Sequence, residues 1–206
     1  MHPAPILVLV APQDIVNIGS AVRIARNFGL AQLRLVTPEV FDPWRIEGIA
    51  HNTGEFIEQI TIHESLTDAV ADCTWTLALT ARERAAKRTV YRPGAGAAEL
   101  IARAELGPVA YVVGREDKGL TNEELDQCSA LVTIPTNPEY KSLNLAQAVA
   151  IMGYESCSRA GGSCGHSSRR ARRARRHRWT CWSGCSPTGA APSSGSSSSR
   201  AGTPRM

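Results

Sequence analysis

The sequence predicts an α/β fold in which a mostly parallel β-sheet carries helices on both faces. Short runs of aliphatic and β-branched residues alternate with helical stretches over residues 1–155. These runs are apolar at consecutive positions, which is typical of strands buried on both faces of a parallel sheet. In such folds ligands bind beyond the carboxyl ends of the strands, so the loops after the strands are the first candidates for a functional site.

Six strands and four helices are predicted. Gly29 is a typical C′ residue for the first helix, and Ser65 and Thr121 each begin a capping pattern with an acidic residue three positions later. Ser142 is the expected N-cap of the last helix. The expected strands are residues 6–10, 33–36, 59–62, 75–80, 109–113 and 131–134, and the expected helices are residues 19–28, 65–72, 121–127 and 143–155.

The composition changes abruptly near residue 155. Residues 1–155 contain 13 Lys and Arg against 19 Asp and Glu, whereas residues 156–206 contain 10 Arg and no acidic residue. The second segment also lacks Leu, Ile, Val, Phe and Tyr, so it cannot bury enough apolar surface to offset the entropy lost on folding. We therefore expect one folded domain over residues 1–155 and a disordered tail over residues 156–206.

Three interpretations of the tail are open. It could be an Arg/Ser arm that neutralises RNA phosphates, or a metal site, although the spacing of its Cys and His residues matches no zinc pattern. It could also be the translation of a GC-rich gene in a wrong frame, which we favour because this explains the sudden loss of periodicity. The Cys and His residues concerned are Cys164, His166, His177, Cys181 and Cys185.

Composition also bounds the setting of the protein. No apolar run approaches the roughly 18 residues of a transmembrane helix, and the N-terminus lacks the basic region of a signal peptide. Six cysteines in 206 residues are too few for a disulfide scaffold. We therefore expect a cytoplasmic protein without membrane contact and without a metal cofactor.

Three loops after the expected strands are rich in Gly, Pro, Asn or charged residues. Residues 11–20 lead to Arg23, residues 114–120 follow the fifth strand, and residues 135–142 follow the sixth. Each loop leads into a helix N-terminus, where backbone groups can bind a ligand. The Gly94 and Gly96 pair is excluded as a dinucleotide motif, because no strand is expected before it and Glu99 replaces the third glycine.

In this order and spacing, the three loops resemble the signature motifs of the SPOUT-class RNA 2′-O-ribose methyltransferases, in particular the TrmJ type of tRNA methyltransferase. Residues 17–23 (NIGSAVR) resemble motif 1 and residues 114–124 (GREDKGLTNEE) motif 2. Residues 134–148, with SLNLA at 142–146, resemble motif 3. The similarity extends over residues 6–155 and ends where the composition changes.

The resemblance implies a SPOUT fold whose C-terminal part forms a deep trefoil knot, an exception to the rule that chains do not thread loops. It also implies S-adenosylmethionine (AdoMet) as methyl donor, held in the knot largely by backbone groups. Glu116 could belong to this site or could simply pair with Arg115 or Lys118. The cofactor-binding residues implied are Leu79, Thr80, Ala81, Gly114, Glu116, Ile134, Lys141, Ser142 and Leu143.

The resemblance further implies an obligate homodimer in which motif 1 of one subunit completes the active site of the other. Arg23 is the expected catalytic residue. Because a guanidinium stays protonated, we expect it to hold a substrate phosphate and stabilise negative charge on the reacting oxygen rather than act as a base. Ser142 and Tyr140 are expected to line the methyl-transfer site, and Asn17 and Asn144 to organise the loops.

A basic cluster follows the expected fourth strand. Its members are Arg82, Arg84, Lys87 and Arg88, and we expect them to contact tRNA phosphates beside the active site. The aromatic residues Trp44, Trp75 and Phe56 are instead expected in the core or in a dimer interface, rather than as platforms for stacked bases.

The predicted function is AdoMet-dependent 2′-O-methylation of tRNA, at the cytidine or uridine ribose of anticodon-loop position 32. Two alternatives stay open. One is a SPOUT enzyme that methylates another tRNA position or rRNA. The other is a non-catalytic RNA-binding module with the same fold.

Overall fold

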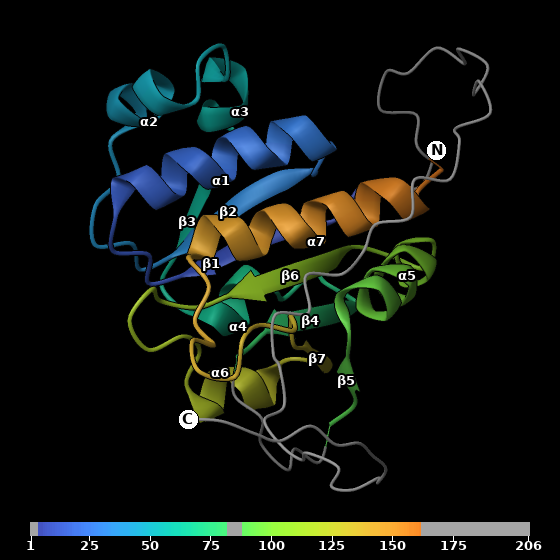
Figure 1. The fold of residues 1–206 in the computed structure, drawn as a ribbon. Coiled ribbons are helices and arrows are strands. Elements are labelled where there is room, and N and C mark those ends of the chain that lie inside the picture. The colour runs from blue at the N-terminus through green and yellow to red at the C-terminus, as the bar shows by residue number, and fades with distance from the viewer. Residues whose placement is uncertain (1–3, 82–87, 162–206) are drawn as a thin grey trace, which may run out of the picture. The chain divides into compact units, whose positions relative to one another are not determined.

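Seven parallel strands form one sheet in the computed structural model, which describes residues 4–81 and 88–161 (Figure 1). Their order across the sheet is β3-β2-β1-β6-β4-β7-β5. β1 and β6 therefore lie side by side near the middle, in register from Ile6 opposite Ala110. The strands are β1 Ile6–Val10, β2 Gln32–Val36, β3 Thr61–His63, β4 Trp75–Leu79, β5 Val90–Tyr91, β6 Val109–Val113 and β7 Ala130–Val132.

Helices cover both faces of the sheet, as predicted. Alternate side chains of a strand point to opposite faces, and in β1 Leu7 and Leu9 join a core cluster with α1, α2, α5 and α7. Val8 and Val10 join a second core cluster with α4 and α6. The helices are α1 Ile15–Phe28, α2 Pro43–Ile49, α3 Gly54–Glu58, α4 Leu66–Ala69, α5 Pro93–Ala104, α6 Asn122–Gln127 and α7 Leu145–Arg159.

Local capping explains where α1 and α7 differ from the predicted ranges. α1 begins four residues early because the Asp14 carboxylate accepts the N–H of Val16 at 2.8 Å. Asn144, and not Ser142, is the N-cap of α7, because its side-chain oxygen accepts the N–H of Ala146 at 2.9 Å. The expected caps Ser65, Thr121 and Gly29 are confirmed.

α7 also continues through the expected domain boundary at residue 155 to Arg159. Ser156, the first residue of the expected tail, is buried in this helix. Residues 162–206, which include all five Cys and His residues considered as metal ligands, lie outside the described part of the chain, as do Arg82, Arg84 and Lys87.

Four elements were not predicted: α2, α3, α5 and β5. α5 carries Gly94 and Gly96 in its first turn, and glycine is a poor helix former. Gly96 is needed for packing, because a Cβ there would lie 3.2 Å from Leu77. The expectation that no strand precedes this glycine pair was wrong, since β5 does. The dinucleotide motif stays excluded, because both glycines are helical rather than in a phosphate-binding loop.

α1 and α7 lie side by side on one face of the sheet (Figure 1). They approach closely because Gly153 of α7 has no side chain, and a Cβ there would lie 2.7 Å from the ring of Phe28. The Tyr111 hydroxyl of β6 donates to the carbonyl oxygen of Met152 at 3.3 Å and ties α7 to the sheet. This packing fixes the N-terminal ends of α1 and α7 relative to the strand ends.

Arg34, a buried residue of β2, forms an ion pair with the more exposed Asp72. Its guanidinium donates to both carboxylate oxygens, at 2.5 and 2.9 Å, and to the carbonyl oxygen of Ala69 at 2.7 Å. These bonds hold the end of α4 against the sheet. Hydrogen bonding to Arg34 lowers the pKa of Asp72 from its ordinary value of 3.8 to about 2.

We predict that Asp72→Asn destabilises the fold at neutral pH. A carboxyl whose pKa is lowered on folding stabilises the protein above its ordinary pKa, and this contribution is lost as the pH falls through the folded value. Because the Asp72 side chain is 54% exposed, solvent screening limits the effect to about 1 kcal/mol. Urea unfolding at pH 7 should show this difference from wild type.

The same comparison at lower pH tests the cause. The difference should shrink as the pH falls from 3.8 towards 2, where Asp72 becomes protonated in the folded wild type as well. A difference that stays constant over this range would show that the carboxylate charge contributes nothing.

Candidate functional site

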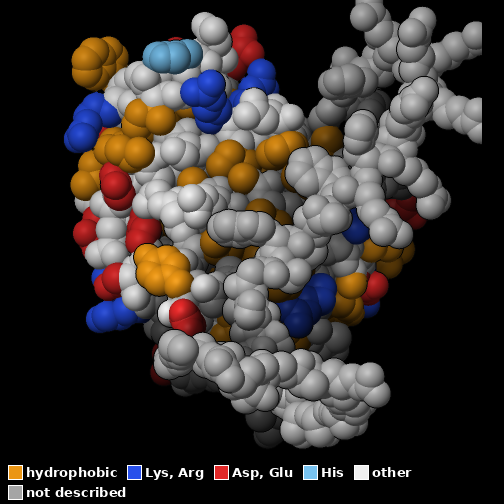
Figure 2. Space-filling model, in the orientation of Figure 1, with side chains coloured by type: hydrophobic (Ala, Val, Ile, Leu, Met, Phe, Trp, Pro, Cys, Tyr) orange, Lys and Arg blue, Asp and Glu red, His pale blue; other side chains and the backbone are white. Residues whose placement is uncertain are grey.

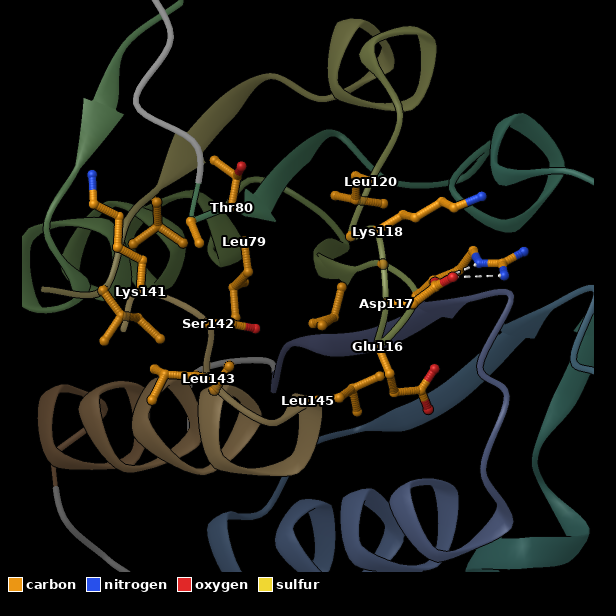
Figure 3. A pocket seen from close by; sticks show the side chains of 18 residues that line it. Leu79, Thr80, Glu116, Asp117, Lys118, Leu120, Lys141, Ser142, Leu143 and Leu145 are labelled. Carbon is orange, nitrogen blue, oxygen red and sulfur yellow. Dashed lines mark hydrogen bonds and ion pairs between the residues drawn. The ribbon is translucent and has the colours of Figure 1, made fainter. Parts of the chain in front are cut away.

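A pocket of about 270 Å³ opens at the carboxyl ends of β4, β6 and β7 (Figure 3). It is built by three segments that are distant in sequence: the end of β4, the loop after β6, and the segment from β7 to the first turns of α7. The lining residues are Leu79, Thr80, Ala81, Val113, Gly114, Arg115, Glu116, Asp117, Lys118, Gly119, Leu120, Val132, Ile134, Lys141, Ser142, Leu143, Leu145 and Ala148.

All nine residues that the sequence assigned to a cofactor line this one pocket. Sequence reasoning missed the rest of the lining. Most of these residues lie in the motif 2 loop; Leu145 and Ala148 lie in the motif 3 segment but were not singled out for the pocket, and Val132 was assigned only to a strand. A buried strand followed by a Gly-rich loop was the only sequence signal for these residues. It predicts a site after the strand, but it does not show which residues at the end of the strand will line that site.

The loop after β6, residues 114–120, closes tightly on itself. A Cβ on Gly114 would lie 2.3 Å from the backbone nitrogen of Leu120, so no other residue fits there without moving the backbone. Gly119 has φ +65°, a left-handed conformation that glycine adopts at little cost. Its N–H donates to the carbonyl oxygen of Arg115 at 2.9 Å and closes the turn.

Glu116 connects this loop to the N-terminus of α1. Its carboxylate accepts the N–H of Gln13 at 3.0 Å, the N–H of Asp14 at 3.4 Å and the side-chain amide of Asn17 at 3.0 Å. A carboxylate is stabilised there by the free N–H groups and the dipole of the helix. Arg115 does not take up this carboxylate, because its guanidinium lies 3.0 Å from Asp117.

Asn17 extends the connection to α7. It is buried, with 8% of its surface exposed, and its side-chain oxygen accepts a hydrogen bond of 2.9 Å from the amide of Asn144. Asn144 is the N-cap of α7. We call Glu116, Asn17 and Asn144 the carboxamide bridge, because the carboxamides of the two Asn residues and the Glu116 carboxylate together join the segments of motifs 2, 1 and 3.

Two residues expected at the site do not line the pocket of their own chain. Arg23 is exposed on α1, and no side chain in the described ranges pairs with it. It follows Asn17 by six residues, so it lies about 9 Å further along the helix and on another face. Tyr140 is 77% exposed in a turn that its own N–H closes with Asn137.

The Arg88 side chain packs against the end of α6. Its guanidinium donates to the carbonyl oxygens of Asp126 and Cys128 at the end of α6, which are acceptors that a helix C-terminus leaves free. Arg88 thus caps α6, while its side chain stays partly exposed, and its contact with RNA stays a prediction.

The described part of the chain also shows features that limit which other functions it can have. Burial raises the pKa of the Cys128 thiol to about 11, so it stays protonated and is not an activated nucleophile. Across residues 4–81 and 88–161, no three His, Cys, Asp or Glu side chains gather as metal ligands. In the same ranges, no helix has the length and apolarity needed to cross a membrane.

Comparison with known proteins agrees with this architecture. Residues 4–154 match the SpoU rRNA Methylase family. Over 149 residues the chain is 39% identical to the tRNA (cytidine/uridine-2′-O-)-methyltransferase TrmJ of Yersinia pestis (strain Pestoides F), and the match covers 72% of this chain and 58% of that relative.

Two solved structures are also similar. TrmJ from Z. mobilis ZM4 has a TM-score of 0.70 at 36% identity, over 77% of this chain and 70% of that one. An AdoMet-bound rRNA methyltransferase from Sinorhizobium meliloti has a TM-score of 0.57 at 24% identity, over 76% of this chain and 57% of that one. The second likeness shows a shared fold.

A parallel sheet with a pocket at its carboxyl edge, lined by the end of β4 and by the motif 2 and motif 3 segments, is thus the architecture of a SPOUT-class methyltransferase. The chain belongs to the SpoU rRNA methylase family. It spans less than two thirds of the length of the Yersinia relative.

We predict that the Asn17–Asn144 hydrogen bond couples the two helices energetically. Asn144→Ser keeps an N-cap for α7 but removes the amide that donates to Asn17. In a double-mutant cycle with Asn17→Ala, measured by urea unfolding, the coupling energy should be about 1 kcal/mol. Additive effects of the two substitutions would show that the bond contributes nothing.

Proposed function

We propose that this chain is the catalytic domain of an AdoMet-dependent tRNA 2′-O-methyltransferase. The main support is that the three segments resembling motifs 1, 2 and 3 are brought together by the fold: two of them line one pocket, and the carboxamide bridge ties the first to them. The TrmJ relatives are named for cytidine and uridine 2′-O-methylation. We therefore propose the ribose of a tRNA cytidine or uridine as the target, and, as the motif resemblance implies, we assign it to anticodon-loop position 32 of cytoplasmic tRNA.

The pocket has the properties of a site for this donor. Its walls combine apolar side chains such as Leu79, Ile134 and Leu143 with backbone groups and a few polar side chains, as small-molecule sites do. The bare backbone of Gly114 lets the motif 2 loop close on itself against Gly119 and Leu120, which sets the shape of this wall of the pocket. Thr80, Lys141 and Ser142 would supply polar contacts to the donor. Glu116 would hold the motif 2 loop in place through its hydrogen bonds to the start of α1.

We also propose that the segment from β7 to α7 threads a preceding loop and forms the trefoil knot. The support is that residues 141–145, which follow β7, share the pocket with the motif 2 loop that precedes β7. In this arrangement the ends of β4, β6 and β7 would hold the donor in a fixed, bent position.

When bound, AdoMet supplies a methyl group on a positively charged sulfur that the ribose 2′-oxygen can attack in line. The protein must then align the ribose and stabilise charge on its oxygen. We assign this role to Arg23, whose guanidinium can grip the adjacent phosphate through two parallel hydrogen bonds. Ser142, whose hydroxyl the sequence assigned to the methyl-transfer site, lines the pocket.

The position of Arg23 supports a homodimer. Because Arg23 lies outside the pocket of its own chain, we propose that Arg23 of the partner subunit completes each site. The face formed by α1 and α7 is suited to such contact: Phe28 and Tyr154 form an edge-to-face aromatic pair, with 6.4 Å between the ring centroids, and Tyr154 is largely exposed. Exposed apolar surface of this kind marks interaction sites.

tRNA is the proposed partner of the positive residues around the pocket. Arg82, Arg84 and Lys87 directly follow Ala81, which lines the pocket, and Lys118 and Lys141 line it as well. Cations at these places would hold tRNA by its phosphates while the target ribose enters.

The direct test of function combines the full chain, tRNA transcripts and AdoMet. We predict one 2′-O-methylated pyrimidine, at position 32, when the tRNA products are digested and mapped by mass spectrometry. Gly114→Ala, which disrupts the motif 2 loop, is the control and should give no product. Methylation only at another tRNA position or in rRNA would indicate the related enzyme, and RNA binding without product would indicate a non-catalytic module.

We predict that Arg23→Ala lowers kcat at least about 100-fold, the usual effect of removing a group that stabilises transition-state charge. Calorimetry should show AdoMet binding within about twofold of wild type, because the role proposed for Arg23 is to hold the RNA phosphate and the reacting oxygen, not the donor. A large loss of AdoMet binding would contradict the role assigned to Arg23.

Mixed dimers test whether Arg23 acts across the interface. A dimer of one Arg23→Ala subunit and one Gly114→Ala subunit has one site with an intact pocket and an intact Arg23 from the partner subunit. It should recover about half of the wild-type activity. If Arg23 served its own pocket, neither site would be intact and the mixed dimer would stay inactive.

A further inference from the structure

A groove of about 590 Å³ lies between α1 and α2. Val16 of α1 and Trp44 of α2 line it, and the Trp44 side chain is 82% exposed. Figure 2 shows hydrophobic and basic side chains close together over this region of the molecule. Trp44 is therefore not in the core, one of the two places expected for it, whereas Trp75 and Phe56 are core residues.

The packing of α2 explains why Trp44 is left at the surface. α2 is anchored to α1 by Ile46, which is fully buried, and by Ile49, which lies so close to Gly19 that a Cβ there would be 2.8 Å away. Residues two positions apart on a helix do not share a face. Since Ile46 points into the core, Trp44 points away from it.

The groove adjoins the pocket along the chain. Gln13 and Asp14 donate their N–H groups to Glu116, which lines the pocket, and Ile15 and Val16 line the groove immediately after them. Val16 also lies on the same face of α1 as Arg23, because seven residues make nearly two full turns, about 10 Å along the axis. The groove therefore borders the surface on which Arg23 is presented.

Charge favours a nucleic acid rather than a protein in this groove. Arg45 and His51 line it, and in the described part of the chain no side chain pairs with Arg45 or with Arg23. The one acidic lining residue, Glu47, has a carboxylate oxygen 3.3 Å from the Cβ position of Gly54 and so is turned towards α3. An aromatic ring beside an unpaired arginine is the combination that single-stranded nucleic-acid sites use, the ring for a base and the cation for the backbone. Trp and Arg are also enriched at protein interfaces, so the test below includes the oligomeric state.

We propose that Trp44 is a stacking platform for an unpaired nucleobase that neighbours the target nucleotide, with Arg45 on its phosphate. This inference rests on the proposed function, because it takes an RNA loop as the substrate. Stacking is tolerant of base identity, since every base has a π-face. Trp44 therefore contributes affinity for an open loop, while the pocket and Arg23 act on the ribose.

The test compares RNA binding and turnover in Trp44→Ala, Trp44→Phe and wild type. For an anticodon stem-loop RNA, Trp44→Ala should raise Kd about tenfold, the loss expected for one stacked base. Trp44→Phe should stay within about threefold of wild type because it keeps an aromatic face. Kd for AdoMet and kcat at saturating RNA should not change, and a fully paired duplex of the same composition should bind all three proteins equally.

Leu106→Ala is the matched control, since it truncates a large exposed hydrophobic side chain away from the groove, and it should bind RNA like wild type. An unchanged Kd in Trp44→Ala, with wild type active, would overturn the stacking role and leave the proposed function standing. A fall of Trp44→Ala to half the molar mass in light scattering would overturn it in favour of a subunit interface. A wild type that neither binds RNA nor methylates it would refute the proposed function itself.

Discussion

The site depends on one carboxylate placed at a helix N-terminus. Glu116 accepts two backbone N–H groups at the start of α1 and the amide of Asn17, so a single side chain fixes the loop after β6 against the helix after β1. These elements meet because β1 and β6 are neighbours in the sheet. Without this contact, the motif 2 loop would have no partner on the α1 side, and the pocket would lose the support of one wall.

Asn17 makes this contact directional. A carboxamide has one donor end and one acceptor end, and Asn17 uses its donor end for Glu116 and its acceptor end for Asn144. Aspartate at position 17 would set two carboxylates against each other, and leucine would remove the side-chain acceptor that the exposed amide of Asn144 uses. Each end thus determines which residue type can occupy the neighbouring motif, which explains why three distant loops carry matching polar residues.

Sequence patterns predicted the parts of this fold that follow from local chemistry. The strands around Leu7 and Tyr111 are apolar at every position, and the caps Ser65 and Thr121 act within one helical turn, so both can be recognised locally. α5 was missed because glycine is a poor helix former. Gly96 allows close packing against Leu77 of β4, a contact that exists only in the folded protein. The pocket could be predicted as a place but not as a shape, because Gly114 is required by the backbone of Leu120, a contact that exists only after the loop has closed.

The exposure of Trp44 could not be predicted from the local sequence. Its sequence context, an aromatic residue near the start of a Pro-initiated helix, does not distinguish a buried ring from an exposed one; only the placement of Ile46 and Ile49 against α1 decides it. The pocket itself uses residues 79–148 alone, and Glu116 ties it to the start of α1. Donor binding can therefore be local to one chain. In the proposed function, RNA would contact the outer surfaces of α1 and α2 together with the basic residues of the pocket. Arg23 and the Trp44 groove share the surface of α1 and α2, so gripping the substrate and aligning its ribose would depend on a single helix pair, whose spacing is set by Gly19.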